Sequence, residues 1–268
     1  MNVVDRDTVM CISLAARPGD HGNRFHNFLY AELGLNFLYK SFTSSDIGAT
    51  IAGVRSLGIR GVSVSMPYKE SCMPFLDALD PSAAAIDSVN TIVNDDGVLT
   101  GYNTDYLAVR TLLDDVPRGP FALRGSGGMA KAVLAALVDS GFDDGVVVAR
   151  NETTGRALAE RYGVAWSAGL DERRPGLLCN ATPIGMSGGP GEHDLAFEAD
   201  AVRAAGTVLE AVYLPAETPL VRLAREAGAR VIAGGAIMEL QALEQFVRYT
   251  GVRPTADQVT RAEAYAAG

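Results

Sequence analysis

Cysteine and histidine are scarce in this chain of 268 residues, and their spacing excludes several kinds of site. The three cysteines, Cys11, Cys72 and Cys179, share no C-x-x-C spacing. This argues against a disulfide framework or a zinc site and favours a reducing cytoplasm. The three histidines show no metal-ligand spacing either. We therefore expect a cytoplasmic protein without a metal.

Long apolar runs and excess positive charge are also missing. No stretch of about 18 residues is free of charges and turn formers, so no transmembrane helix is expected. The first ten residues, MNVVDRDTVM, lack the basic start and apolar centre of a signal peptide. The net charge of −9 argues against a nucleic-acid or membrane partner. A small molecule is the expected partner, bound by a monomer or homodimer.

Apolar patterning predicts two α/β lobes. In the first hundred residues, short apolar runs predict strands at 9–14, 37–42 and 61–65, alternating with helices at 25–33 and 47–57. This alternation is typical of an α/β lobe with a mainly parallel sheet. After Arg118-Gly119-Pro120, a strand at 121–124, a helix at 131–140 and a strand at 145–149 form a βαβ unit. Later elements are expected at 177–180, 208–210, 230–232 and 237–249.

The domain assignment follows from this change of pattern. Residues 107–236 are predicted to form a Rossmann-type nucleotide-binding domain. Residues 1–106 are predicted to form the other domain, to which the C-terminal helices of 237–268 return.

A glycine-rich segment lies between the predicted strand at 121–124 and the following helix. It matches G-x-G-x-x-[GA], in which the first glycine permits a tight turn and the second lets the backbone approach a pyrophosphate. Free N–H groups at the helix start would hold the anion. Alone the motif is weak, but its strand–loop–helix setting favours dinucleotide binding. The expected cofactor-binding residues are Gly125, Ser126, Gly127, Gly128, Met129 and Ala130.

The end of the next strand bears on which dinucleotide binds. NAD-binding chains usually carry an acidic residue there, whereas an arginine accommodates the 2′-phosphate of NADP. Arg150 and Asn151 stand 25 and 26 residues after Gly125, which favours NADP. Glu152 complicates the choice, since it could serve a ribose hydroxyl or cap the following helix. A merely solvated Arg150 is the structural alternative.

Three polar segments of the first lobe lie at the ends of predicted strands, where open α/β sheets bind ligands. They are Ser63-Val64-Ser65-Met66-Pro67-Tyr68-Lys69, Ser88-Val89-Asn90-Thr91 and Gly101-Tyr102-Asn103-Thr104-Asp105. A lysine beside a carboxylate can remove the proton of a hydroxyl as hydride leaves. Taken singly, Lys69 would be a surface charge, and Asn90 and Asp105 turn formers or helix caps.

Taken together and in order, these segments resemble the shikimate dehydrogenase family. That family carries N-V-T-x-P-x-K, V-N-T, G-x-N-T-D, a glycine-rich loop, N-x-T-x-x-G-M and G-x-x-M-x-x-x-Q. The last two correspond here to Asn180-Ala181-Thr182-Pro183-Ile184-Gly185-Met186 and to Gly235, Met238 and Gln241. The likeness spans about residues 10–250. It implies two α/β lobes, an N-terminal substrate domain and an NADP-binding Rossmann domain, with the active site in the cleft between them.

The resemblance also implies a role for each matching residue. Lys69 and Asp105 match the catalytic pair of an NADP-dependent oxidoreductase of aromatic amino acid biosynthesis (the chorismate pathway), which interconverts 3-dehydroshikimate and shikimate. The substrate-binding positions are Ser65, Asn90, Tyr213 and Gln241. Further cofactor-binding positions are Thr182, Gly235 and Met238.

One departure separates this chain from typical members. Asp20 and Gly22 occupy the places of two serines that hold the carboxylate of the substrate, and an aspartate there would repel a carboxylate. The pattern is closest to the divergent branch of shikimate dehydrogenase-like proteins. It leaves open weak shikimate activity, another hydroxylated ring as substrate, and a non-catalytic NADP(H) sensor. A folate-linked dehydrogenase would not need the Asn-Thr-Asp and Gln241 contacts.

Overall fold

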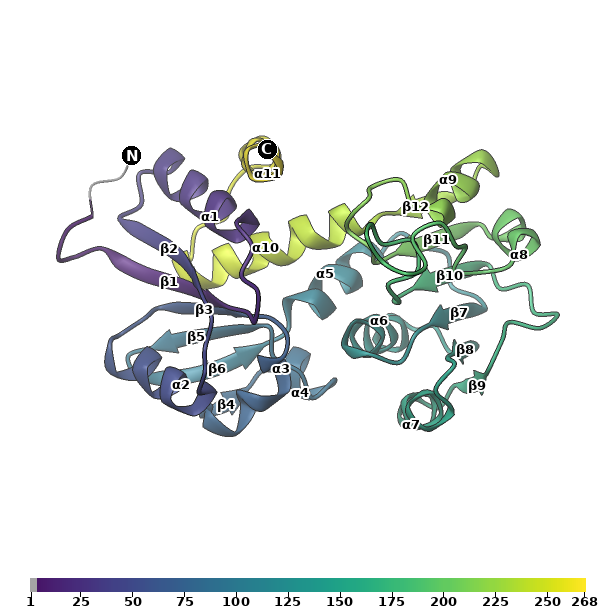
Figure 1. The fold of residues 1–268 in the computed structure, drawn as a ribbon, viewed down its shortest axis with the longest axis horizontal. Coiled ribbons are helices and arrows are strands. Elements are labelled where there is room, and N and C mark those ends of the chain that lie inside the picture. Colours follow the sequence, from purple (N-terminus) through teal and green to yellow (C-terminus); the bar gives the residue numbers. More distant parts are fainter. Residues whose placement is uncertain (1–3) are drawn as a thin grey trace. The chain divides into compact units, whose positions relative to one another are not determined.

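A computed structural model describes residues 4–268, which form two compact units (Figure 1). The first unit runs to Thr104 and also contains Glu239–Gly268, and the second is Asp105–Met238. Residues 1–3, which begin the segment that lacks signal-peptide character, lie outside the described residues. Within residues 4–268, every helix is too short or too polar to cross a membrane.

The first unit is built on a six-stranded sheet of order β2-β1-β3-β5-β6-β4. The strands β1, β2 and β3 pair in parallel, but β5 is antiparallel to both of its neighbours, so the expectation of a mainly parallel sheet is only partly met. The strands β5 and β6 form a tight hairpin, in which Asp96 and Gly97 both have positive φ, as hairpin turns that match strand twist require. The strands are β1 (Val9–Leu14), β2 (Phe37–Phe42), β3 (Gly61–Val64), β4 (Ala78–Leu79), β5 (Thr91–Asp95) and β6 (Val98–Tyr102).

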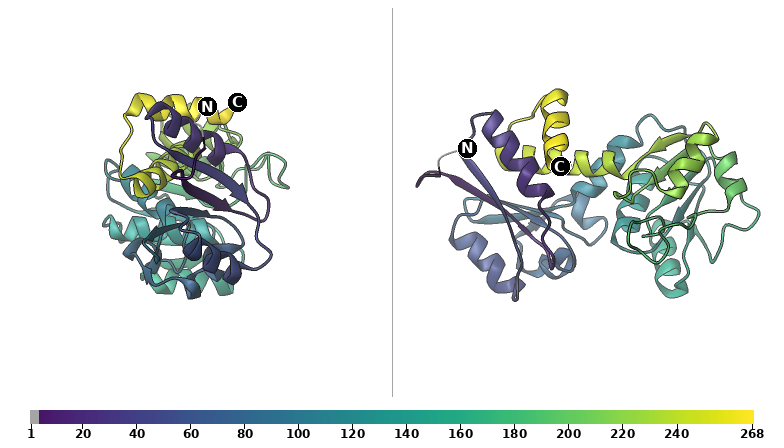
Figure 2. Two further views of the ribbon diagram at one scale, coloured as in Figure 1. Left: turned by 90° about the vertical axis from the view of Figure 1, so that its left-hand side faces the viewer. Right: turned by 45° about the horizontal axis from the view of Figure 1, so that its top comes forward.

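Helices cover both faces of this sheet. On one face α1, the second half of α10 and α11 enclose an aromatic cluster that contains Phe25, Tyr30, Phe246 and Tyr249. Helix α11 packs against α1 (Figure 2). The other face buries aliphatic side chains of α2. The helices are α1 (His21–Glu32), α2 (Ile47–Ser56), α3 (Tyr68–Ser71), the 3-10 turn η1 (Met73–Phe75), α4 (Pro81–Ala84), α10 (Gly234–Thr250) and α11 (Ala256–Ala267).

The second unit holds a fully parallel sheet of order β12-β11-β10-β7-β8-β9. Read from β9, this is the order 3-2-1-4-5-6 of dinucleotide-binding domains, which confirms the predicted Rossmann-type fold. The strands are β7 (Phe121–Arg124), β8 (Gly145–Val148), β9 (Ala165–Ser167), β10 (Leu177–Asn180), β11 (Thr207–Glu210) and β12 (Arg230–Ile232). The helices are α5 (Thr104–Leu112), α6 (Gly128–Asp139), α7 (Glu152–Tyr162), α8 (Ala199–Ala204) and α9 (Pro219–Glu226).

Helix starts depart most from the sequence expectations. Helix α1 begins at His21, four residues before the predicted start, and α6 begins at Gly128 rather than at 131. The first turn of α1 contains a glycine and polar residues, and α6 begins inside the glycine-rich loop at Gly128-Met129-Ala130, so apolar helical periodicity is not yet evident at either start.

Candidate active site

The glycine-rich loop joins β7 to α6 and leaves room for an anion. Gly125 has φ +125°, and a Cβ there would lie 2.9 Å from the carbonyl oxygen of Ala181, so only glycine fits. A Cβ at Gly127 or Gly128 would meet no atom within 4 Å, so space is open at the start of α6. The first turn of α6 carries no acidic side chain. Its N–H groups are therefore suited to bind a pyrophosphate.

The loop after β8 holds the residues expected at the 2′-phosphate. Arg150 is exposed, while the side chain of Asn151 accepts a hydrogen bond from the Thr154 N–H (3.1 Å) and caps α7. The Ser126 and Thr154 hydroxyls are 2.8 Å apart, which ties the glycine-rich loop to α7. Glu152 accepts a hydrogen bond from Arg156 Nε (2.8 Å). Glu152 thus has a cationic partner on its own helix.

Arg124 is a candidate that sequence reasoning missed. It is the last residue of β7, its guanidinium lies 5.3 Å from the centre of the Phe197 ring, and its Nε has no partner among the described residues. Burial lowers the pKa of Arg124; the charge of Glu198 opposes this shift and that of Arg150 adds to it. Arg124 and Arg150 are therefore close enough for their charges to interact. The only sequence signal was an arginine directly before Gly125.

A buried carboxyl group organises the loops that follow β10 and β11. Glu210, at 0% exposure, accepts hydrogen bonds from Asn180 Nδ2 (2.8 Å), the Val212 N–H (3.0 Å) and the Thr218 hydroxyl (2.9 Å). Burial raises the pKa of Glu210 to about 7. The Oδ1 of Asn180 in turn accepts from the Thr182 hydroxyl (2.6 Å). One carboxyl therefore positions the loop with Thr182 and the loop with Tyr213.

Three more predicted site residues lie in the segments that follow this network: Tyr213 in a loop, and Gly235 and Met238 at the start of α10. Tyr213 comes directly after Val212, in a loop that also contains a cis Leu214–Pro215 bond. Gly235 and Met238 lie in the first turns of α10. A Cβ on the neighbouring Gly234 would lie 2.2 Å from the Val212 carbonyl oxygen, so the start of α10 packs directly against the Tyr213 loop. These three predicted site residues therefore come from adjacent segments of the second unit.

In the first unit, Asn90 is an oriented hydrogen-bond donor. Its Oδ1 accepts from the Thr104 N–H (2.8 Å) and from the hydroxyls of Thr91 (2.8 Å) and Thr104 (3.1 Å). Its Nδ2 is buried and has no partner among residues 4–268. A buried N–H₂ group left without an acceptor is costly, so this one is suited to an oxygen of a bound molecule.

Ser65 and Lys69 lie beside Asn90. The Asn90 carbonyl accepts from the Val64 N–H (2.7 Å), and the Lys69 carbonyl accepts from the Val89 N–H (2.9 Å). Ser65 follows β3 and is exposed, while Lys69 is half-buried in α3. The structure thus brings Ser65, Lys69 and Asn90 to one edge of the first sheet. Asp105 lies in the first turn of α5 and belongs to the second unit.

Gln245 is a second residue that the sequence analysis missed. It lies on α10 one helical turn after the predicted Gln241, so both face the same side. Its Nε2 donates to the Thr91 hydroxyl (3.1 Å) and to the Ser63 hydroxyl (3.2 Å). The repeat of glutamine at i and i+4 was the signal that could have revealed it.

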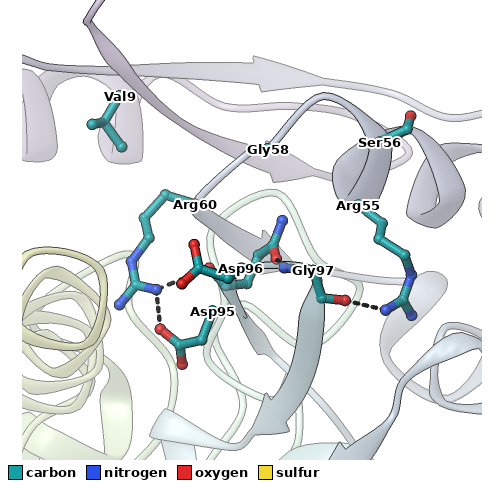
Figure 3. Close-up of a pocket in the computed structure, with 9 residues that line it drawn as sticks. Val9, Arg55, Ser56, Gly58, Arg60, Asp95, Asp96 and Gly97 are labelled. Atoms are coloured by element: carbon teal, nitrogen blue, oxygen red, sulfur yellow. Dashed lines mark hydrogen bonds and ion pairs between the residues drawn. The ribbon is translucent and has the colours of Figure 1, made fainter.

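A surface pocket of about 460 Å³ lies elsewhere in the first unit and is unsuited to be the site (Figure 3). It surrounds the β5–β6 turn, near the start of β1, whereas α/β sheets bind ligands at the carboxyl ends of their strands. Arg60 pairs with Asp95, and Arg55 donates to the Gly97 carbonyl, so both guanidinium groups serve the turn. Over residues 4–268, no three His, Cys, Asp or Glu side chains are grouped to hold a metal.

Comparison with known proteins places these observations in one family. Residues 22–92 match the family model described as the shikimate dehydrogenase substrate binding domain. The chain is 49% identical to a shikimate dehydrogenase-like protein of Haemophilus influenzae, over 98% of each chain. It is 35% identical to the shikimate dehydrogenase (NADP(+)) of Pyrococcus abyssi, over 92% of this chain and 95% of that one. A solved structure of a shikimate 5-dehydrogenase-like protein matches with a TM-score of 0.98 at 48% identity, over 99% of this chain and all of the other.

Proposed function

Because the chain belongs to the shikimate dehydrogenase family, we propose that it is an NADP-dependent oxidoreductase that interconverts 3-dehydroshikimate and shikimate, or a close hydroxylated-ring relative. The observation that carries the proposal is the buried Nδ2 of Asn90, held in place through Oδ1 and left without an acceptor. A ring hydroxyl of the substrate would supply that acceptor.

NADP is the proposed cofactor, and the second unit fits it. The open space at Gly127 and Gly128 and the N–H groups of α6 suit its pyrophosphate. Arg150, with Arg124 nearby, would bind the 2′-phosphate, for which a guanidinium is a good partner. When bound, the nicotinamide would supply the acceptor of a hydride. Asn151, Thr182, Gly235 and Met238 are proposed to complete the cofactor site.

Lys69 and Asp105 are proposed as the catalytic pair. Lys69 is half-buried and lies beside Asn90 along the backbone, where a substrate hydroxyl held by Asn90 would be close to it. A lysine amine can take the proton of the reacting hydroxyl as hydride leaves, and Asp105 is proposed to act with it. Ser65, Tyr213 and Gln241 are proposed to bind the remaining polar groups of the ring.

A second candidate function is a non-catalytic NADP(H)-binding sensor. It is favoured by Asp20 and Gly22, which replace the serines that typical members use for a substrate carboxylate. A sensor would bind NADPH without oxidising any ring alcohol. The retained Lys69, Asn90, Asp105 and Gln241 favour the enzyme.

Initial-rate oxidation of shikimate and quinate with NADP and with NAD, followed by nicotinamide absorbance, tests the proposal. We expect turnover with NADP, and a loss of at least about 100-fold in kcat for Lys69→Ala because a proton-transfer group is removed. NADPH binding, measured by nicotinamide fluorescence, should persist in that variant. Equal turnover by wild type and Lys69→Ala would reject the catalytic role. NADPH binding by the wild type without oxidation of any ring alcohol would favour the sensor.

A further inference from the structure

The side chain of Gln245 joins two strands of the first sheet at the edge that carries Asn90. Ser63 of β3 and Thr91 of β5 are in register, where the antiparallel pairing of these two strands ends. The Gln245 Nε2 donates to the hydroxyls of Thr91 (3.1 Å) and Ser63 (3.2 Å). It also donates to the Asn90 carbonyl oxygen (3.4 Å), and Gln245 is only 3% exposed. One buried amide from α10 therefore holds both strands directly beside Asn90.

The atoms of this network are assigned by what their neighbours can donate or accept. The Asn90 carbonyl oxygen can only accept, so the amide atom of Gln245 that faces it is the nitrogen. That nitrogen can only donate, so the Thr91 hydroxyl accepts from it and gives its own hydrogen to Asn90 Oδ1 (2.8 Å). A directed chain of hydrogen bonds therefore runs from Gln245 through Thr91 to the side chain of Asn90.

The Asn90 amide is held in one orientation as a result. Its Oδ1 also accepts from the Thr104 N–H (2.8 Å), a group that can only donate. A flipped amide would set its N–H₂ group against this N–H and against the Thr91 hydroxyl hydrogen, and it would lose both hydrogen bonds. The buried Nδ2, which has no partner among residues 4–268, therefore remains the atom of Asn90 that is available to a ligand.

On the basis of the proposed function, we propose that Gln245 is a positioning residue for the substrate. It fixes the carbonyl of Asn90 and the hydroxyl of Thr91, and thereby preorganises the Asn90 amide to donate to an oxygen of the ring. A side chain that is ordered in advance loses no rotamer freedom on binding, so its ligand binds more tightly. Gln245 thus acts through Asn90 rather than on the reacting atoms, and the ring oxygen at Asn90 must accept a hydrogen bond.

The first measurement observes Asn90 directly and needs no substrate. The full chain is labelled with ¹⁵N-asparagine, and the side-chain amide signal of Asn90 is identified by its absence in Asn90→Ser. In the wild type, ¹⁵N relaxation should give this amide an order parameter in the rigid range, about 0.8. Gln245→Leu keeps a side chain of similar size but has no donor, so the order parameter should fall below about 0.6.

The second measurement asks whether Gln245 acts through Asn90. Gln245→Leu should raise the KM for shikimate with NADP about fivefold, which corresponds to one weakened hydrogen bond, and change kcat by less than about twofold. In the Asn90→Ser background, the same substitution should change the KM by less than about twofold, because the group that Gln245 positions is absent. A residue that merely supports the fold would raise the KM equally in both backgrounds.

Matched variants separate the hydrogen bonds from packing. Phe246, the next residue on α10, is fully buried in the aromatic cluster. Phe246→Leu should lower the stability of the chain to urea without altering the Asn90 order parameter or the KM. Thr91→Val removes the hydroxyl and should reproduce the effects of Gln245→Leu, whereas Thr91→Ser retains it and should keep the wild-type values.

The outcomes distinguish this inference from the proposed function. A rigid Asn90 amide in Gln245→Leu, or an equal loss of order in Phe246→Leu, would overturn the positioning role. Oxidation of no ring alcohol by the wild type would reject the dehydrogenase, and the order parameters would still decide whether Gln245 positions Asn90. Loss of order in Gln245→Leu and Thr91→Val but not in Phe246→Leu, with a rise in KM that requires Asn90, would support both.

Discussion

The buried carboxyl of Glu210 should make the second unit less stable as the pH rises toward neutrality. In the folded chain burial raises its pKa from 4.5 to about 7. The unfolded chain releases the proton near the ordinary value, whereas the folded chain retains it until about pH 7. Between these values the folded state binds more protons, so the free energy of unfolding falls as the pH increases. Below this pH window the free energy of unfolding has its full value, and above the window the whole loss caused by ionisation of Glu210 has taken place.

The size of this loss in the free energy of unfolding follows from the pKa shift of Glu210. Each pKa unit corresponds to 1.36 kcal/mol, so a shift of about 2.5 units gives a loss of roughly 3 kcal/mol across the window. The hydrogen bonds from Asn180, Val212 and Thr218 favour the charged form and oppose the effect of burial. This loss is a large share of the stability of a typical domain.

Urea unfolding measured at several pH values between about 5 and 8 provides the assay. Trp166 is the chain's single tryptophan, and it lies on β9, so its fluorescence follows the unit that contains Glu210. Glu210→Gln replaces the carboxyl with an amide that does not titrate. The free energy of unfolding of this variant should lack the decline of roughly 3 kcal/mol.

Glu226→Gln, at an exposed position at the end of α9, is the matched control and should keep the wild-type profile. Because all other groups titrate alike in wild type and variant, the difference between their profiles isolates Glu210. Parallel profiles for wild type and Glu210→Gln would refute the assignment of a raised pKa to this residue.

Two predictions concern the cofactor site. Gly125→Ala should weaken NADPH binding at least about tenfold and lower the stability of the protein, because φ +125° and the 2.9 Å approach to the Ala181 carbonyl oxygen leave no place for a Cβ. Fluorescence titration with NADPH measures this loss. The control Gly119→Ala, where a Cβ meets no atom within 4 Å, should bind NADPH normally. Arg150→Ala should weaken NADP binding by about tenfold or more and leave NAD binding nearly unchanged, since only NADP carries the 2′-phosphate; equal losses for both cofactors would contradict that role.

The sequence predicts the strands well because they are short apolar runs bounded by glycine and proline. The expected bounds 9–14, 37–42 and 121–124 coincide with β1, β2 and β7. The β5–β6 hairpin escaped prediction, since its polar residues were interpreted as ligand-binding segments. Its signal was Asp96-Gly97, a pair that favours turns with two positive φ angles.

The candidate site, like the fold, was only partly predictable from the sequence. Motifs identify residues that are close in sequence, such as Lys69 and the glycine-rich loop. They do not identify partners that only folding brings together. Asn180 and Glu210 are 30 residues apart, and Gln245 reaches Thr91 across 154. Such pairs depend on which strands become neighbours, and that order is set by packing of the whole sheet.

Strand register has the largest effect on how the chain's departure from its family is interpreted. From sequence, Asp20 is only the loss of a carboxylate-binding hydroxyl. A shift of one residue in the pairing of β1 would turn Ser13 to the opposite face, away from Ser41 of β2, to which it donates a hydrogen bond. With the observed register, Ser13 donates to Ser41 (2.9 Å), Ser41 donates to Asn23 Oδ1 (3.0 Å), and Asn23 Nδ2 donates to Asp20 (3.1 Å). Asp20 therefore lies at the end of a hydrogen-bonded chain that begins on β1, and the sequence alone does not reveal this connection.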